Sequence, residues 1–233
     1  MNVQSPGWGE LCNVKTGLVS VKIHATMVTV TSHATYHHGD LPNALRAAAA
    51  EVIDDVGLGA FSLREVARRA GVSHAAPAHH FGDTKGLVTS LAIEGFETLT
   101  SLMLAAQAGI DSAEERLAAI GRVYVEFGGE NPGHAAVMFR SDLVRDELPE
   151  LRAAGVAAFE VLERALKRLR DDHGATFDLG DATKLCWATM QGLVQLRGEM
   201  EAVDELRGVQ SAGQIDVLDR LMVLLLNGLW PRA

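Results

Sequence analysis

The first third of the chain contains several histidines that could ligate a metal ion or donate hydrogen bonds. The candidates are His37–His38, His74 and His79–His80. Adjacent histidines on a helix point in different directions, and no cysteine or carboxylate accompanies these ones at the spacing of metal ligands. The sequence also lacks a nucleophile elbow, a phosphate-binding loop and an HExxH motif. We therefore expect no metal site, no cofactor and no catalysis, and the histidines remain candidate hydrogen-bond donors.

Two short helices are predicted in this region, and the second of them holds His74 and His79–His80. Ser62 and Glu65 form an S-x-x-E capping box, and Phe61 can pack against Val66 across that helix start. Gly71 follows as a residue that can take the left-handed conformation and end the helix.

The next helix start is predicted at Ser73, which is a preferred N-cap residue. The helix that begins there should run to Phe81. Two short helices around a glycine-containing turn form a helix-turn-helix, which we place at Ser62–Phe81.

The flanking segments are also predicted to be helical. One helix starts at Leu41 with Asp40 as its N-cap and ends at Gly57. A longer helix, capped by Asp83 or Thr84, follows the helix-turn-helix. Glycine, proline, asparagine or aspartate then separates five amphipathic segments, which are Ala113–Phe127, Pro132–Leu143, Leu148–Arg170, Asp181–Met200 and Ile215–Leu229. The sequence therefore predicts an all-α fold with a three-helix head and a helical-bundle body.

Charge is distributed unevenly between these two parts. The chain has a net charge of −9, but residues 1–90 hold 7 basic and 7 acidic side chains, whereas residues 91–233 hold 14 and 23. Seven of the nine histidines also lie in the first 90 residues, where partial protonation adds positive charge. The acidic total therefore does not exclude a nucleic-acid partner, provided that the head is the part that faces it.

A helix-turn-helix reads DNA with side chains of its second helix, which enters the major groove. That helix has no arginine for the common contact to guanine, so we expect His74 and His79 to donate to base acceptors or to phosphate. Ala75 or Ala76 can contact a thymine methyl group, while His80 either faces DNA or packs with its neighbour. The full expected set of DNA contacts is Ser62, Arg64, Ser73, His74, Ala75, Ala76, Pro77, His79, His80, Thr84 and Lys85.

Phosphate contacts within that set are expected from the serines, Arg64, Thr84 and Lys85, together with backbone N–H groups at the starts of three helices. Arg68 and Arg69 either contact phosphate, face solvent or form a salt bridge with Glu65. Because each head has few cations, two heads on a two-fold DNA site are needed for affinity, which predicts a homodimer.

The segment SLREVARRAGVSHAAPAHHF at Ser62–Phe81, with a helix before it and an acidic helical body after it, resembles the TetR family of bacterial repressors. The sequence YHHGDL at Tyr36–Leu41 is similar to the YHHGNLR signature of one branch. The sequence WATMQG at Trp187–Gly192 is similar to that branch's C-terminal Trp-His-Gly motif. The resemblance covers most of residues 36–233.

Three positions depart from the family pattern. Gln191 stands where the C-terminal motif usually has histidine, and Ala78 stands where many members have a phosphate-contacting tyrosine. Thr84 occupies a position where lysine is common, with Lys85 following it. These departures affect individual DNA contacts and the ligand more than the fold.

The resemblance implies a cytoplasmic repressor that leaves a palindromic DNA operator when a small molecule binds its body. An apolar effector pocket, with ordinary core as the competing interpretation, could be lined by Tyr124, Phe127, His134, Met138, Phe139, Met190, Gln191 and Val194. Activation instead of repression stays open. The alternative is a dimeric helical sensor or interaction protein whose degenerate helix-turn-helix binds no specific DNA.

A dimer interface could form from Leu148–Arg170 and Asp181–Met200, because two long helices from each subunit can make a four-helix seam. The candidate seam residues, with intramolecular core as the alternative, are Phe159, Leu162, Leu166, Leu169, Trp187 and Leu193.

The domain boundaries follow from these assignments: a disordered arm at 1–35, the DNA-binding head at 36–90 and the effector-binding and dimerisation body at 91–233. The arm has little periodicity and no signal-peptide pattern, and Met27 is an alternative start. No apolar run reaches the length of a bilayer span, so we expect no membrane partner. Cys12 and Cys186 lack metal or redox spacing, which favours a reducing compartment.

Overall fold

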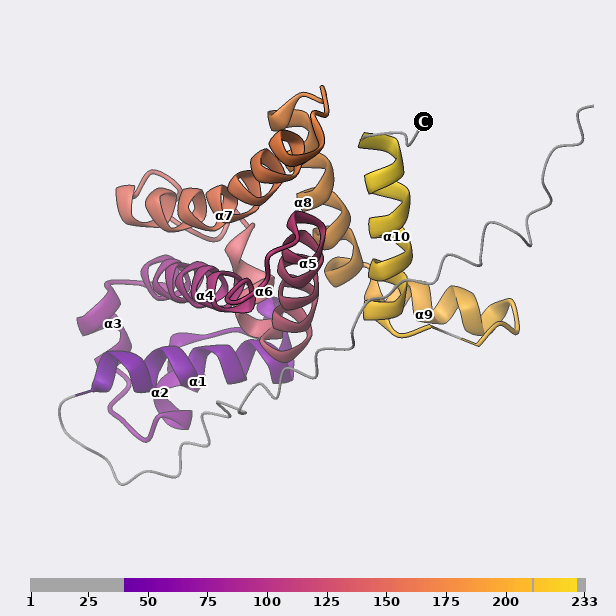
Figure 1. The fold of residues 1–233 in the computed structure, drawn as a ribbon. Coiled ribbons are helices and arrows are strands. Elements are labelled where there is room, and N and C mark those ends of the chain that lie inside the picture. The colour runs from indigo at the N-terminus through magenta and orange to yellow at the C-terminus, as the bar shows by residue number, and fades with distance from the viewer. Residues whose placement is uncertain (1–39, 211, 230–233) are drawn as a thin grey trace, which may run out of the picture. The chain divides into compact units, whose positions relative to one another are not determined.

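The computed structural model describes residues 40–210 and 212–229, and the regular structure in these ranges is helical, as the sequence predicts (Figure 1). The expected arm at 1–35 and the signature at Tyr36–Gly39 lie outside the described residues. In chain order the elements are α1 (Leu41–Val56), the 3₁₀ turn η1 (Leu58–Ala60), α2 (Leu63–Arg69), α3 (Ala76–Phe81), α4 (Thr84–Ala106), α5 (Ala113–Glu130), α6 (Pro132–Met138), α7 (Pro149–His173), α8 (Leu179–Gln195), α9 (Arg197–Leu206) and α10 (Gln214–Leu229).

Two helices of the body are shorter than the sequence predicts. The segment expected to be one helix from Asp181 to Met200 is two helices, because α8 ends at Gln195 and α9 starts after Leu196. The helix expected to reach Leu143 ends at Met138. The chain beyond it is held against α4 instead, since the backbone N–H of Arg145 donates to the Thr89 hydroxyl at 2.8 Å.

Helix α4 connects the head with the body and lies at the centre of both. It contacts α1 and α3 in the head and α5, α6 and α7 in the body. Leu87, Leu91, Leu99 and Met103 are buried along its length. The expected boundary after residue 90 falls inside this continuous helix.

By length and composition alone, α4 could cross a membrane, contrary to the expectation that no segment is long and apolar enough. Half of its most apolar stretch is buried inside the protein. Burial against five other helices accounts for this composition, because a central core helix needs apolar side chains on most of its sides.

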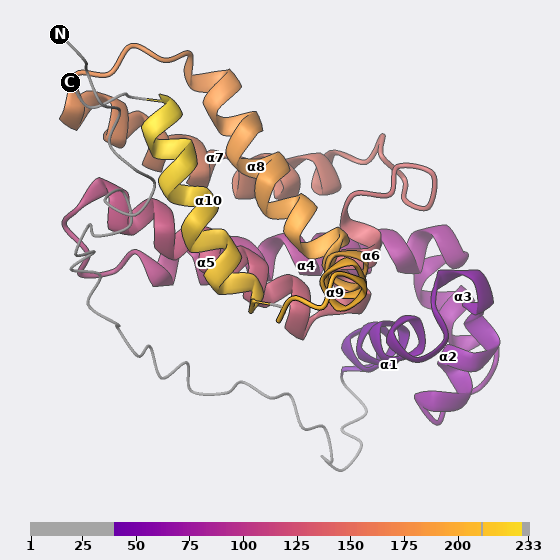
Figure 2. The same ribbon diagram turned by 90° about the vertical axis from the view of Figure 1, so that its right-hand side faces the viewer.

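Helices α8 and α10 lie side by side on the outside of the body (Figure 2). Helix α10 packs against α5 and α8, and Leu218 and Met222 are its buried contacts. Helix α9 follows α8 and contributes no buried residue.

Helix α6 crosses α1 so closely that a glycine is needed at the contact. A Cβ atom at Gly133 would lie 2.6 Å from the carbonyl oxygen of Ala50 and 3.0 Å from its Cα atom. Both of these atoms belong to the backbone of α1, so they cannot move aside as the end of a side chain can. The contact therefore sets the distance between the body and the head at this point.

A polar cluster lies beside that crossing and joins α1, α4 and α6. The Nε atom of Arg46 lies 3.3 Å from a carboxylate oxygen of Glu94, and Nε2 of His134 lies 3.4 Å from the other oxygen. Burial raises the pKa of Glu94, but the hydrogen bond with His134 and the charge of Arg46 outweigh it and hold the pKa below its usual value. His134, expected in the effector pocket, thus belongs to the contact between head and body.

We expect Gly133→Ala to destabilise the protein by about 1–3 kcal/mol, because the methyl group would overlap backbone atoms of α1. Gly198→Ala is the matched control, since this helical glycine has no atom within 4 Å of its Cβ position. The control should be neutral or slightly stabilising because alanine favours a helix. Chemical denaturation measures both variants, and equal stabilities would contradict the close crossing.

We expect Glu94→Gln to lower the free energy of unfolding by about 1 kcal/mol at neutral pH, a figure that allows for solvent screening of this partly exposed group. A carboxylate with a depressed pKa stabilises the folded state above its unfolded-state pKa and loses this effect as the pH falls. The difference from wild type should therefore shrink as the pH drops below 4.5, the ordinary value for this group. Denaturation across a pH series tests this, with Glu97→Gln on the same helix as control. A difference that does not change with pH would argue against the ion cluster.

Candidate nucleic-acid interface

The turn between α2 and α3 is fixed by two backbone hydrogen bonds. The N–H of Val72 donates to the carbonyl oxygen of Ala67 at 3.0 Å, and the N–H of Gly71 donates to that of Arg68 at 3.2 Å. Together they form a Schellman motif, which requires a left-handed residue after the helix. Gly71 takes that conformation with φ +67°, as the sequence predicts. The helix-turn-helix therefore has a defined angle between its two helices.

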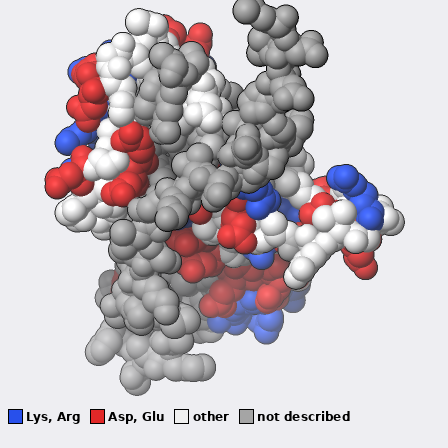
Figure 3. Space-filling view, turned by 45° about the vertical axis from the view of Figure 1, so that its right-hand side comes forward, with Lys and Arg blue, Asp and Glu red and all other residues white. Residues whose placement is uncertain are grey.

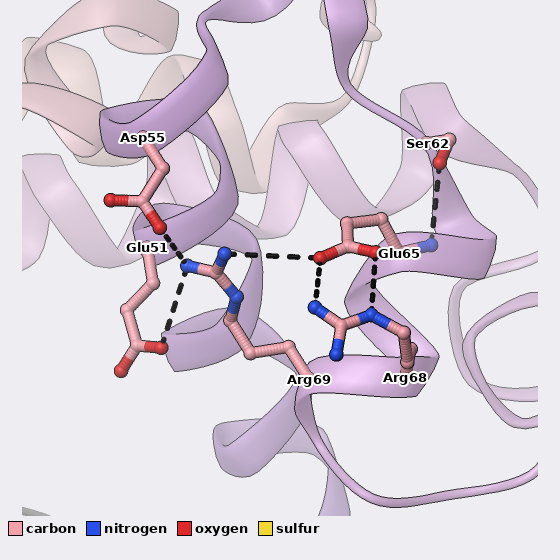
Figure 4. Close-up of polar contacts among 6 residues, drawn as sticks. All are labelled: Glu51, Asp55, Ser62, Glu65, Arg68 and Arg69. Carbon is pink, nitrogen blue, oxygen red and sulfur yellow. Dashed lines mark hydrogen bonds and ion pairs between the residues drawn. The ribbon is translucent and has the colours of Figure 1, made fainter.

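Only one half of the predicted capping box forms at the start of α2. The Ser62 hydroxyl accepts a hydrogen bond from the backbone N–H of Glu65 at 3.3 Å. In the other half, the Glu65 carboxylate would accept a hydrogen bond from the backbone N–H of Ser62. That bond does not form, because Arg68 binds the carboxylate through Nε at 2.8 Å and Nη2 at 2.5 Å (Figure 4). This pairing lowers the pKa of Glu65.

Arg69 is also neutralised by carboxylates, which come from α1 and α2. Its guanidinium lies 2.6 Å from Asp55, 3.9 Å from Glu51 and 3.8 Å from Glu65 (Figure 4). The structure contains a salt bridge for both arginines, and the Arg68 side chain also faces solvent, with 67% of it exposed.

The second helix of the motif starts two residues later than predicted, with Ala75 and not Ser73 at its N-cap position. Ser73 is not its N-cap, because α3 begins at Ala76 and no side chain caps it. A helix capped by Ser73 would need the N–H of residue 77 to bond the Ser73 carbonyl, and Pro77 has none. The N–H of Ala76 bonds that carbonyl instead at 3.0 Å, which makes a tighter turn.

Most of the predicted DNA contacts are exposed around this short helix. The exposed ones are Ser62, Arg64, Ser73, His74, Ala75, His79, His80, Thr84 and Lys85. Ala76 is half-buried. Pro77 is buried inside the head, so it does not fit the predicted role as a DNA contact. The His80 ring lies between those of His79 and Phe81, at centroid distances of 5.3 Å and 6.4 Å.

The start of α4 already has an anionic cap. The Asp83 carboxylate accepts a hydrogen bond from the N–H of Gly86 at 2.7 Å and lies 3.0 Å from Nη2 of Arg145. The Gly86 bond, followed by Arg145, lowers the pKa of Asp83. One of the amide groups expected to bind phosphate is thus occupied. Arg145 is a cation near the interface that the sequence analysis missed, because only folding brings it close to the head.

The surface charge follows the uneven distribution along the chain. Acidic side chains crowd one described face, and a smaller basic group lies at its lower end, where α1 and α2 are (Figure 3). With Arg68 and Arg69 paired, the exposed cations that remain for DNA in the described head are Arg64 and Lys85.

A second candidate site is an open apolar cavity of about 570 Å³ in the body. Phe139 and Gln191 line it, as predicted. Six further lining residues were not predicted for it, and they are Phe96, Gly155, Phe159, Lys184, Trp187 and Ala188. Sequence spacing could not predict that these six residues line one cavity, because they come from three different helices, α4, α7 and α8.

The other predicted pocket residues lie elsewhere. Phe127, Met138 and Met190 are buried core residues, and Val194 packs against Gly128. Tyr124 lies directly behind the cavity, where its hydroxyl donates to Oε1 of Gln191 at 2.5 Å.

The predicted dimer seam is mostly core of a single chain. Leu162, Leu166, Leu169 and Leu193 are buried, while Phe159 and Trp187 line the cavity. This is because α7 packs onto α4 and α5. The exposed apolar residues on the outer pair of helices are Leu185 on α8, Leu196 directly after it, and Val223 and Leu224 on α10.

The described residues contain no group of three or more side chains that could hold a metal ion. Cys186 is buried, and burial raises the pKa of its thiol to about 11. Cys12 lies outside the described residues.

Comparison with solved structures finds the same fold in bacterial proteins, among them transcriptional regulators. A protein of unknown function from Rhodococcus sp. RHA1 is 29% identical, with 83% of this chain and 97% of that one covered and a TM-score of 0.69. FadR from Bacillus subtilis in complex with stearoyl-CoA is 18% identical, with 80% and 98% covered and a TM-score of 0.62. LfrR from Mycobacterium smegmatis in complex with proflavine is 19% identical, with 81% and 95% covered and a TM-score of 0.60.

Two family models match different parts of the chain, whereas no curated protein matches it. Residues 45–91 match the model described as bacterial regulatory proteins, tetR family, and residues 117–207 match the tetracyclin repressor-like C-terminal domain. Both models describe the same non-enzymatic family, and together they span more than half of the chain. The chain therefore belongs to the TetR family and is a helix-turn-helix DNA-binding transcriptional regulator.

Proposed function

We propose that the protein is a cytoplasmic homodimeric repressor that binds a palindromic operator and leaves it when a small molecule enters the body cavity. The observation that carries this proposal is the joint position of α4 and α6. Both helices contact α1 of the head, while Phe96 on α4 and Phe139 directly after α6 line the cavity. A ligand there would touch the elements on which the head rests.

The DNA contacts follow from exposure and hydrogen-bonding capacity. His74 and His79 donate to bases, and Ala75 or Ala76 contacts a thymine methyl group. The phosphate contacts come from Ser62, Arg64, Ser73, Thr84 and Lys85. The exposure of these side chains on α3 and on the chain around it supports this assignment, with Ala76 half-exposed.

Two heads are needed because each one offers few unpaired cations. The exposed apolar residues of α8 and α10 supply the surface on which a second copy would pack, and Leu185 and Leu224 are among them. Side-by-side helices from each copy would form a four-helix seam. This replaces the seam of α7 and α8 that the sequence suggested.

Release requires the ligand to favour one arrangement of the heads over the other. Gly133 touches the backbone of α1 near the start of α6, and Phe139 meets the cavity at its end. A ligand that displaces Phe139 would therefore shift α6 on α1. Similarity of Trp187–Gly192 to the Trp-His-Gly motif supports membership of that branch, since Trp187 and Gln191 both line the cavity.

The deciding experiment selects binding sites for the purified full-length protein from random duplex DNA. An enriched inverted repeat with strongly salt-dependent affinity is the expected result. A reporter whose promoter overlaps this site then separates repression from activation. If no site is enriched and all binding is independent of sequence, the repressor is ruled out in favour of a sensor with a degenerate helix-turn-helix.

We expect Arg64→Ala to weaken binding to the selected site and to reduce the slope of log affinity against log salt concentration by about 2, because the homodimer loses one phosphate contact in each of its two heads. Arg68→Ala is the matched control on the same helix, because Arg68 is bound to Glu65. Its removal should leave the slope unchanged. Titrations at several salt concentrations compare the two, and equal slopes for both variants would refute the assignment.

We expect the double variant Leu185→Glu, Leu224→Glu to be monomeric, because two carboxylates per chain would have to be buried in the seam. Leu206→Glu on α9 is the control, since this side chain is 88% exposed and lies off the proposed surface. Sedimentation velocity measures the oligomeric state. A double variant that remains dimeric would place the interface elsewhere.

A further inference from the structure

The cavity in the body has walls made largely of aromatic rings. The Phe139 ring lies at centroid distances of 5.3 Å from Phe96 and 5.9 Å from Trp187, and Phe159 lies 5.6 Å from Trp187. Phe96 and Phe139, like Phe139 and Trp187, meet edge to face. Rings arranged in this way offer faces and edges to a further ring, which is the preferred geometry of aromatic contacts.

The amide side chain of Gln191 in the wall presents a donor. The Tyr124 hydroxyl donates to Oε1 of Gln191, and burial raises the pKa of Tyr124, so this hydroxyl keeps its proton. An amide whose oxygen is engaged has its NH₂ group left for another partner. No other hydrogen bond of the Gln191 side chain occurs within the described residues. The cavity therefore offers an N–H donor to an acceptor on a ligand.

The charge at the cavity is positive. Lys184 lines it, and no aspartate or glutamate does. The Lys184 ammonium lies 3.3 Å from Asp181 in an exposed pair on the same helix. A single exposed contact of this kind is weak, unlike the two-bond pairing of Arg68 with Glu65, so Lys184 can turn to another anion at little cost.

We propose that the cavity binds a planar aromatic carboxylic acid, with its rings against Phe139, Phe159 and Trp187 and its carboxylate at Gln191 Nε2 and Lys184 Nζ. This assigns a chemical class to the effector and rests on the proposed function, in which the same cavity controls release from DNA. A lipophilic cation can contact the aromatic walls, but Lys184 would repel it. A flexible fatty acid can pair with Lys184, but it has no ring to pack against the aromatic side chains.

Gly155 provides a way to fill the cavity without disturbing the core. A Cβ atom there would lie 3.8 Å from Cζ of Phe96, which is ordinary van der Waals contact. A valine at this position would extend further into the space where a ligand ring lies. Ala153→Val on the exposed side of the same helix is the matched control for the effect of valine on α7.

The test is calorimetric titration of the full-length protein with four probes. These are 2-naphthoate, 2-naphthamide, (2-naphthylmethyl)trimethylammonium and decanoate. We expect 2-naphthoate to bind at least about tenfold more tightly than the cation and decanoate, with 2-naphthamide between them, because it keeps the rings and an acceptor but lacks the charge. If the cation or decanoate binds best, or if 2-naphthoate does not bind, the proposal is overturned.

Four variants test whether 2-naphthoate binds in this cavity. Gly155→Val should abolish 2-naphthoate binding, whereas Ala153→Val should not change it. Gln191→Leu should weaken binding by about five- to tenfold through loss of the donor. Lys184→Glu should reverse the preference between 2-naphthoate and the cation, which remains decisive even if Gly155→Val fails to fold. Undiminished binding to Gln191→Leu and an unreversed preference in Lys184→Glu would overturn the assignment.

Binding of the ligand to the protein and release of the protein from DNA are measured separately. If 2-naphthoate binds as expected but does not displace the protein from its selected DNA site, the ligand class stands and the control of release fails. If the protein selects a DNA site but no naphthalene acid binds, the ligand class fails and the DNA-binding function stands.

Discussion

The burial of α4 is the constraint on which both ends of the molecule depend. The helix starts directly after the second helix of the helix-turn-helix and continues into the middle of the body. Buried leucines such as Leu87 near its start and Leu99 further along each contribute about 1.5–3 kcal/mol. The head consequently cannot turn relative to the body unless α4 moves or α6 shifts on α1. The close crossing at Gly133 makes that second route sensitive to small displacements, since backbone lies directly against backbone.

Two arginines of the head stabilise the head itself. Arg68 forms an ion pair with Glu65 within α2, and Arg69 forms ion pairs that link α2 to the carboxylates of α1. These pairs orient the motif, but they also remove two positive charges from the surface that faces DNA. Arg145 of the body adds one cation near the DNA-binding surface, where it is paired with Asp83. An interface with so few unpaired cations depends on two heads and on hydrogen bonds from Ser, Thr and His side chains.

Helix α8 has three faces with different surroundings. Cys186 and Met190 are buried in the core, and Trp187 and Gln191 line the cavity. Leu185 is exposed on the third face. A ligand in the cavity and a second copy on the outer face would therefore contact neighbouring stripes of one helix. This arrangement offers a direct route by which ligand binding in one subunit reaches the other, in addition to the route through α6 and α4.

The sequence by itself determined the helical fold and the helix-turn-helix, because these depend on local signals: the serine cap at Ser62, the left-handed Gly71 and helical periodicity. It misplaced the start of the second motif helix, where Pro77 removes a backbone donor that a nearby serine cap would need. Which arginines are available to DNA, which apolar residues form core and which line the cavity depended on the tertiary structure. The reason is physical: apolar stripes on α7 and α8 look alike in sequence whether they face the core, a ligand or another chain, and only the packing of distant helices decides which neighbour each side chain meets.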